Sequence, residues 1–303
     1  MFRPGREGRH GDHASGRRTG LTDREDGLGG AAVPAAGETV IVRIDRFCDT
    51  VPKQRARAEQ HGPLVLFVTE GPGWPYYARP KQRPRGRITV ADVRRVRARQ
   101  RELGIPQSFE WIEQVAPDLT EAAAGAGLEV TAHPLMVLDT PPRRTRAPAG
   151  VAVRTVRWDE PDLARIVAVP DVAFAHPGTD VGPAGPAERD KLAADKDEAG
   201  ISRMRETLAA GHSVLAAAFD DQGPLAAGSC QSAGNVAEIT GVGTLPSARR
   251  QGLGAAVTAE LATLAMADGI RTVFLSASDG AVARVYAGLG FRRIGTAMIA
   301  DSR

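Results

Sequence analysis

Arg249-Arg250-Gln251-Gly252-Leu253-Gly254-Ala255-Ala256 is the stretch of this sequence that decides its fold. A strand-like run from Val236 to Leu245 precedes it, and the run that follows carries apolar residues on one helical face, namely Leu253, Val257, Leu261 and Leu264. The first main-chain amides of a helix have no partner within the helix, and glycine lets the main chain approach a ligand closely. The stretch therefore predicts an anion-binding loop at a helix start, with Arg249 and Arg250 adding positive charge.

The surroundings of this loop exclude two common phosphate-binding motifs. The Lys-Ser/Thr pair of a Walker loop is absent, and no repeated strand-helix-strand pattern completes a dinucleotide fingerprint. Instead the sequence continues with a strand-like run from Arg271 to Ala277 and a helical run from Asp279 to Phe291. The loop must therefore be interpreted together with these two later segments.

The order of these segments resembles the GNAT acyltransferase superfamily. Arg249-x-x-Gly252-x-Gly254 resembles the coenzyme A pyrophosphate loop of that family, and Val285-Tyr286-x-x-Leu289-Gly290-Phe291 resembles its second signature. The resemblance covers residues from Val151 to Arg303, about half of the chain. It implies acetyl-CoA as a co-substrate and an N-acetyltransferase that transfers the acetyl group directly to a primary amine.

The resemblance also assigns the residues that would bind the cofactor. In GNAT enzymes the strand before the loop splays from its neighbour and pairs with the pantetheine arm, and glycines at 241 and 243 suit such a departure from regular pairing. The family has an asparagine seven residues before its signature tyrosine, where this chain has Asp279. The implied set comprises Val242, Gly243, Thr244, Arg249, Arg250, Gln251, Gly252, Leu253, Gly254, Ala255 and Asp279.

Two residues are the candidates for catalysis. Glu238 has apolar or small neighbours, so burial should raise its pKa and make it a better general base, directly or through a water molecule. A carboxylate on the solvent side of the strand is the alternative. Tyr286 lies where the family has its thiol-protonating tyrosine and is the candidate general acid, whereas a tyrosine that only packs in the helix is the competing interpretation.

The preceding part of the chain has a similar order of strands and helices but lacks the residues expected to bind coenzyme A. Strands are expected at Thr39 to Ile44, Leu64 to Thr69 and Ser108 to Glu113, and helices at Val90 to Leu103 and Asp118 to Ala126. Both halves end with a helix closed by glycine and a strand that contains a methionine. In the first half, however, prolines in the Gly71 to Pro80 stretch remove amide donors where the phosphate loop should be. Trp74, Tyr76 and Tyr77 would pack between the halves or line a substrate channel.

These patterns define the predicted architecture. We expect an α/β (α+β) fold of two tandem GNAT-like units, each with a mixed, mostly antiparallel sheet flanked by helices, and with a splayed central strand in the second unit. The predicted parts are a disordered tail (1–37), a degenerate GNAT-like domain (38–139), a linker (140–150) and a GNAT acetyltransferase domain (151–303).

Composition restricts the remaining functions. Two cysteines among 303 residues fit a reducing compartment, so a cytoplasmic protein is expected, and they do not form the cluster of a metal site. No run reaches the ~20 apolar residues of a membrane span, so no membrane partner is expected. A net charge of +3 does not require nucleic acid, although the arginine-rich tail keeps that reading open.

The resemblance implies a small-molecule or peptide amine as the acceptor, without identifying it, and a homodimer is compatible with the sequence. The loop from Ala173 to Asp180 is expected to select the acceptor. The alternative function is a non-catalytic acyl-CoA-binding sensor or scaffold, which the Asp279 substitution and the degenerate first half motivate.

Overall fold

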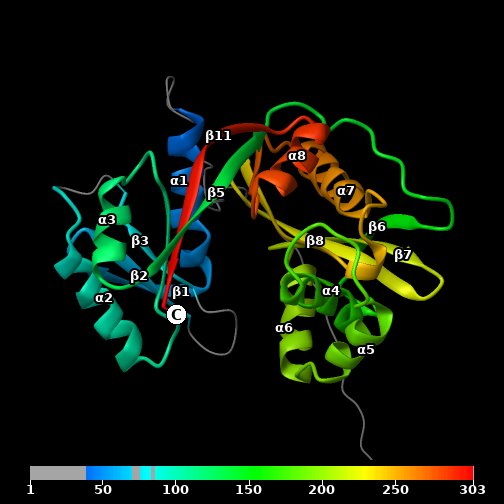
Figure 1. Ribbon diagram of the computed structural model, residues 1–303, viewed down its shortest axis with the longest axis horizontal. Coiled ribbons are helices and arrows are strands. Elements are labelled where there is room, and N and C mark those ends of the chain that lie inside the picture. Colours follow the sequence, from blue (N-terminus) through cyan, green and yellow to red (C-terminus); the bar gives the residue numbers. More distant parts are fainter. Residues whose placement is uncertain (1–38, 70–75, 83–85, 303) are drawn as a thin grey trace, which may run out of the picture. The chain divides into compact units, whose positions relative to one another are not determined.

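A single mixed sheet runs through the chain in the computed structural model, which describes residues 39–69, 76–82 and 86–302 (Figure 1). The predicted disordered tail and Trp74 lie outside the described residues. Along the sheet the strands follow the order β1 (Ala56–His61), β2 (Leu64–Thr69), β3 (Ala78–Pro80), β4 (Ser108–Ile112), β11 (Arg292–Asp301), β5 (Glu129–Leu138), β10 (Thr272–Ser276), β9 (Val236–Thr244), β8 (Gly223–Ala233), β7 (Val214–Asp220) and β6 (Ala152–Val156).

Helices cover both faces of this sheet. In the second half α7 and α4 contact β8 and β9 from opposite faces. Figure 1 shows α7 and α8 on one side of these strands and α4 to α6 on the other. The described helices are α1 (Val40–Thr50), α2 (Val90–Glu102), α3 (Asp118–Gly125), α4 (Leu163–Ala175), α5 (Pro186–Ala194), α6 (Glu198–Ala209), α7 (Leu253–Ala267) and α8 (Gly280–Leu289), with short 3-10 turns at Pro52–Gln54 and Pro246–Ala248.

The last strand of each half lies in the sheet of the other half. β5 follows α3 in the chain but pairs with β10 of the second half, and β11 follows α8 but pairs with β4 of the first half. β5 and β11 also pair antiparallel with each other over most of their length, as the two long strands side by side in Figure 1. This exchange joins the two predicted sheets into one.

The two halves repeat the same strand pairing. A parallel pair, β3 with β4, recurs as β9 with β10, and the antiparallel hairpin β1–β2 recurs as β7–β8. The other pairs are antiparallel. The expected fold, a tandem α/β (α+β) arrangement with a mixed, mostly antiparallel sheet flanked by helices, is confirmed.

The strand expected at Thr39 to Ile44 is wrong, because this segment begins helix α1. Thr39 caps the helix by accepting a hydrogen bond from the amide of Val42. The β-branched run favoured a strand, but Ile44 and Phe47, which are three residues apart, are both buried on one face of a helix. Tertiary burial therefore overrides local propensity here. The expected helices at Val90 and Asp118 and the strands at Leu64 and Ser108 are confirmed.

Helix α1 packs at the junction of the two halves. Ile44 and Phe47 belong to a buried cluster with Ile112 of β4, Val236 of β9 and Phe274 of β10. The Phe47 and Phe274 rings meet edge to face with centroids 5.2 Å apart. Two larger clusters fill the first and second halves on either side. A helix of the first half thus covers strands of both halves.

Candidate functional site

The loop that begins α7 presents main-chain donors. Arg250 has φ 66° and Gly252 has φ 77°, so the chain turns through the left-handed region twice before the helix starts. Among the described residues, none accepts a hydrogen bond from the main-chain N–H groups between Arg250 and Ala255. A Cβ placed on Gly252 would meet nothing within 4 Å. The loop therefore offers open, unsatisfied amides at a helix N-terminus, the usual arrangement for binding an anion.

Side chains behind this loop fix its position. Leu253 is 1% exposed and belongs to the second-half core, so its side chain anchors the start of α7. A Cβ on Gly254 would lie 3.2 Å from Oγ1 of Thr244, which means that glycine allows the first turn of α7 to pack against the end of β9. The side chains of Leu253 and Thr244 thus position the loop.

Arg249 makes contacts that the sequence did not predict. Its guanidinium donates to the main-chain oxygens of Asp180 (3.2 Å), Ala173 (3.1 Å) and His176 (2.5 Å). Arg249 therefore connects the segment after α4 to the loop that precedes α7. The neighbouring Arg250 is exposed. Of the two predicted positive charges, Arg250 is the one directed to solvent.

Strand β9 separates from β10 beside this loop. The two strands pair in parallel only from Val236 to Glu238, although β9 continues to Thr244. On its other side β9 carries a bulge, since Ser229 of β8 pairs with Thr240 and Ala227 pairs with Gly243. The edge of β9 beyond Glu238 therefore has no strand partner toward β10. Val242, Gly243 and Thr244 all lie in this segment.

Gly243 lies in this segment because helix α4 crosses the strand there. A Cβ at this position would lie 2.8 Å from Cα of Pro170 and 2.9 Å from Cβ of Ala173, both in α4. Pro170 is inside the helix, where its missing N–H leaves one carbonyl without its usual partner. The glycine thus permits close packing of α4 on the splayed strand, and it keeps this face of β9 free of a side chain.

Glu238 lies where β9 and β10 separate. Burial raises the pKa of its carboxyl from 4.5 to about 7. The side chain is half-buried, and no described residue makes a hydrogen bond or an ion pair with it. It shares its face with Val236, which packs under α1. The sequence-based expectation of a buried site with a raised pKa thus agrees with the environment of this side chain.

Tyr286 is packed in the second-half core. It is 8% exposed, and its ring lies 6.0 Å from that of Phe291. Burial raises the pKa of its phenol to about 12, and a hydrogen bond with Thr258 of α7 acts in the opposite direction. Thr258 is therefore the side chain that acts on this hydroxyl, although its own Oγ1 donates to the main-chain oxygen of Gly254 at 2.8 Å.

Asp279 caps helix α8. Its Oδ1 accepts hydrogen bonds from the amides of Ala281 (2.7 Å) and Val282 (2.9 Å). These bonds lower the pKa of the carboxyl, so it is ionised at the positive end of the helix. A local structural role thus explains an aspartate at this position.

Sequence reasoning missed a group of polar side chains under α1. We call this group, Asp45, Cys48, Tyr77, Arg79 and Glu110, the junction cluster. Burial raises the pKa of Glu110 to about 8, and the Glu238 charge adds to the shift. The same charge acts on Cys48 and Tyr77 and raises both of their pKa values, after burial as the main cause. The available signal was Phe109-Glu110-Trp111, a glutamate between large apolar residues in a strand.

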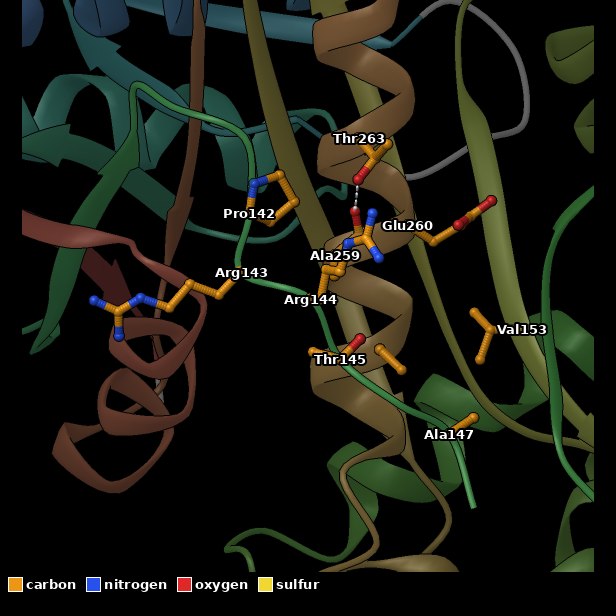
Figure 2. Close-up of a pocket in the computed structure, with 10 residues that line it drawn as sticks. Pro142, Arg143, Arg144, Thr145, Ala147, Val153, Ala259, Glu260 and Thr263 are labelled. Carbon is orange, nitrogen blue, oxygen red and sulfur yellow. Dashed lines mark hydrogen bonds between the residues drawn. The ribbon is translucent and has the colours of Figure 1, made fainter. Parts of the chain in front are cut away.

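The hollow drawn in Figure 2 lies elsewhere, between the linker and the outer side of α7. It has a volume of about 270 Å³, and Arg144 is directed toward α7 whereas Arg143 is directed away from it. Neither Glu238 nor Tyr286 lines it. We therefore do not assign the reaction to this hollow. Its lining consists of Pro142, Arg143, Arg144, Thr145, Ala147, Val153, Ala256, Ala259, Glu260 and Thr263.

Two further searches covered the described residues alone. Within these ranges no group of His, Cys, Asp and Glu side chains is arranged to hold a metal ion. In the same part of the chain, no helix combines the length and apolarity needed to cross a membrane.

The chain is similar to one protein family and to several solved structures. Residues 186–291 match the Acetyltransferase (GNAT) family, while none of the curated proteins matches the chain. A GCN5-related N-acetyltransferase from Kribbella flavida is 23% identical, with 87% of this chain and 95% of that chain covered and a TM-score of 0.64. A functionally unknown conserved protein from Staphylococcus epidermidis is 14% identical, with 81% and 93% covered and a TM-score of 0.50.

A tandem GNAT protein from the clavulanic acid biosynthesis pathway also matches. It is 20% identical, covers 78% of this chain and 77% of that chain, and has a TM-score of 0.48. The family match spans the phosphate loop, the splayed strand and the helix of Tyr286, and GNAT proteins use acetyl-CoA. The protein thus has the fold of GCN5-related N-acetyltransferases, and its residues 186–291 match the Acetyltransferase (GNAT) family.

Proposed function

We propose that the second half, residues 151–303, binds acetyl-CoA and transfers its acetyl group to a primary amine. The observation that carries this proposal is the adjacency of three features: unsatisfied amides at the start of α7, the unpaired edge of β9, and Glu238 where β9 and β10 separate. In the same proposal residues 38–139 form a degenerate GNAT-like domain, and residues 140–150 link it to the second.

The loop fits the pyrophosphate of coenzyme A. The open amides from Arg250 to Ala255 would hold its oxygens, and Arg250 would add a full charge. The unpaired edge of β9 at Val242, Gly243 and Thr244 would bind the pantetheine arm in the manner of an added strand. When bound, acetyl-CoA supplies an acetyl group activated as a thioester.

Glu238 is the proposed general base. A carboxyl with a pKa of about 7 is partly ionised at neutral pH and is a stronger base than an ordinary glutamate. The amine nitrogen forms a bond to the thioester carbon as the carbon–sulfur bond breaks. The proton of the attacking nitrogen goes to Glu238, directly or through water, and main-chain amides near Val242 stabilise the carbonyl oxygen.

Tyr286 is the proposed donor to the leaving sulfur. Its raised pKa keeps the phenol protonated, so the hydroxyl can donate a hydrogen bond to sulfur. Complete proton transfer to a thiolate whose acid has a pKa of ~8.5 is uphill from a phenol at about 12. The hydroxyl must also exchange its bond with Thr258 for one with sulfur. We therefore assign Tyr286 a moderate contribution to the rate.

The alternative is an acyl-CoA sensor without catalysis. It is favoured by the same two observations, that the Tyr286 hydroxyl is bonded to Thr258 and that Asp279 is used as a helix cap. Acetyl-CoA binding without thiol release over a broad panel of amines would support it.

The test compares two glycine variants by calorimetry with acetyl-CoA. Gly252→Asp places a carboxylate among the loop amides and should weaken binding by at least about tenfold, equivalent to 1.4 kcal/mol. Gly269→Asp is the matched control, because Gly269 also has a positive φ (85°) and open space around it but lies at the other end of α7. Equal affinity in the two variants would refute the loop assignment.

A further inference from the structure

The strand exchange brings one glutamate from each half to the same side of α1. Ile112 of β4 and Val236 of β9 both pack against this helix. Because side chains alternate along a strand, Glu110 and Glu238, each two residues away, face the same side as Ile112 and Val236. The pairings of the strands between them make β4 antiparallel to β9. Glu110 precedes Ile112 in its strand, whereas Glu238 follows Val236 in its strand. Both glutamates therefore lie toward the same end of the sheet, relative to Ile112 and Val236.

The positive charge of the junction cluster, that of Arg79, is already paired with Asp45. Arg79 is 1% exposed and donates to the main-chain oxygen of Asp45 at 2.8 Å and to its carboxylate. Gln82 donates to the other carboxylate oxygen of Asp45 at 2.6 Å. The Arg79 and Asp45 charges therefore compensate each other, which leaves Nε of Arg79 as a buried donor without a hydrogen-bond partner.

Glu110 and Glu238 have no ion-pair partner among the described residues, although the Arg79 charge acts on Glu110 from a distance. No described residue makes a hydrogen bond or an ion pair with either carboxyl. Both side chains keep part of their surface exposed, so a ligand can reach them. Buried polar groups in proteins are normally satisfied, and the Glu238 charge acts on Glu110 and raises its pKa. Ionisation of both carboxyls is therefore unfavourable, and a positively charged group bound between them would favour it.

The acetyl-transfer chemistry restricts what this positive group can be. An amine must be neutral when it attacks, so the reacting nitrogen cannot remain an ammonium partner for both carboxyls. One carboxyl takes the proton from the reacting nitrogen. The other stabilises a bound acceptor only if the acceptor carries a second positive charge.

We infer that Glu110, contributed by the first half, is an acceptor-binding residue, and that the acceptor is a diamine or polyamine. Its second ammonium pairs with Glu110 while its reacting amine lies at Glu238. This inference rests on the proposed function. It gives the first half a role in substrate recognition.

The test measures KM and kcat for a series of α,ω-diaminoalkanes and for the monoamines of the same chain length. The wild-type protein should have a lower KM for diamines. Glu110→Gln should raise the diamine KM at least about tenfold, change kcat little, and leave the monoamines unaffected. Glu102→Gln, at an exposed glutamate outside the cluster, is the control and should change nothing.

Proton release gives a second readout. A bound ammonium lowers the pKa of Glu110, so diamine binding should release protons, measured by calorimetry in two buffers of different ionisation enthalpy. The charged groups that face Glu110 are Glu238, Asp301 and Arg79. The release should be smaller in Glu110→Gln and unchanged in Glu102→Gln.

The possible failures are distinct. Equal effects of Glu110→Gln on diamines and monoamines, a wild-type preference for monoamines, or no diamine binding by a protein that does bind acetyl-CoA would each overturn this inference alone. Absence of acetyl-CoA binding would overturn the proposed function.

The melting temperature of Glu110→Gln should not fall, because the change removes a carboxyl that burial makes unfavourable to ionise. A lower melting temperature would therefore identify a misfolded variant.

Discussion

Arg249 donates a hydrogen bond to the main-chain oxygen of Ala173 at 3.1 Å, which connects the loop before α7 to the end of α4. The same guanidinium also bonds to the oxygens of Asp180 and His176. The segment expected to select the acceptor is thus held by a residue of the loop proposed to bind the cofactor. The neighbouring Arg250 has a left-handed backbone, and this difference separates the roles of the two arginines.

Arg249→Ala should therefore reduce stability, whereas Arg250→Gly should increase it. Loss of the Arg249 hydrogen bonds should lower the free energy of unfolding by about 1 kcal/mol, since these bonds are partly exposed. Glycine at position 250 removes the strain of a positive φ and should add about 1 kcal/mol, while it weakens acetyl-CoA binding several-fold by removing a charge. Urea unfolding and calorimetry check both effects. Equal stability changes in the two variants would contradict this assignment.

The rate of acetyl transfer should depend on the ionisation of Glu238. Because its pKa is about 7, kcat/KM should fall about tenfold per pH unit below about pH 6 and bend near pH 7. The Glu238 charge raises the pKa values of Glu110, Cys48, Tyr77 and Cys230, and of these groups Glu110 is the one that titrates in the same pH range. Glu238→Gln should abolish the bend. A variant that keeps it would exclude Glu238 as the base.

The same pKa shift makes a prediction about stability. Glu238 is raised from 4.5 to about 7 and therefore binds more protons folded than unfolded between these values, so folding stability falls as the pH rises through this window. Glu238→Gln should remove this loss of stability. The free energy of unfolding of the variant, relative to that of the wild-type protein, should therefore be higher at pH 8 than at pH 5. The difference should be about 2 kcal/mol after allowance for partial exposure. Urea unfolding at both pH values measures it.

Tyr286→Phe should lower kcat about tenfold and leave acetyl-CoA affinity unchanged. A hydroxyl that donates to the leaving sulfur acts in the transition state and not in cofactor binding. Tyr76→Phe is the control with the same chemical change. If Tyr286 serves only to pack the core, the Phe variant should keep full kcat and lose about 1 kcal/mol of stability with its Thr258 bond.

Asp279→Asn tests whether this cap also lies near the cofactor. Asparagine caps a helix nearly as well as aspartate, but it carries no negative charge. If phosphates bind nearby, acetyl-CoA affinity should increase about threefold, an effect that salt reduces. Asp197→Asn is the matched control, since Asp197 caps α6 in the same way through Ala199 and Gly200. Equal changes in both variants would place Asp279 away from the phosphates.

The sequence predicted the elements around the loop because their signals are local. The glycines at 252 and 254 and the apolar face of α7 are all read within a few residues. The start of α1 was mispredicted because its burial depends on strands about 70 to 230 residues away in the chain. Glu110 was missed for the same reason. Its proximity to Glu238 follows from the exchange of β5 and β11, and no local pattern encodes that pairing.

The strand exchange should make the two halves one cooperative unit. β5 lies between β10 and β11, so it cannot leave without breaking the sheets of both halves. Insertion of a protease site between Arg144 and Thr145, in the linker outside every strand, followed by cleavage, should yield two fragments that copurify and unfold in a single transition.

A chain that begins at residue 140 is the comparison for this experiment. It lacks β5, so the edge of β10 is uncovered and the chain should aggregate. Two independent transitions in the cleaved protein, or a soluble and folded second half alone, would show that the exchange contributes little to stability. Adding a peptide of residues 126–140 to the truncated chain should restore solubility, because β5 would then pair again with β10 and β11.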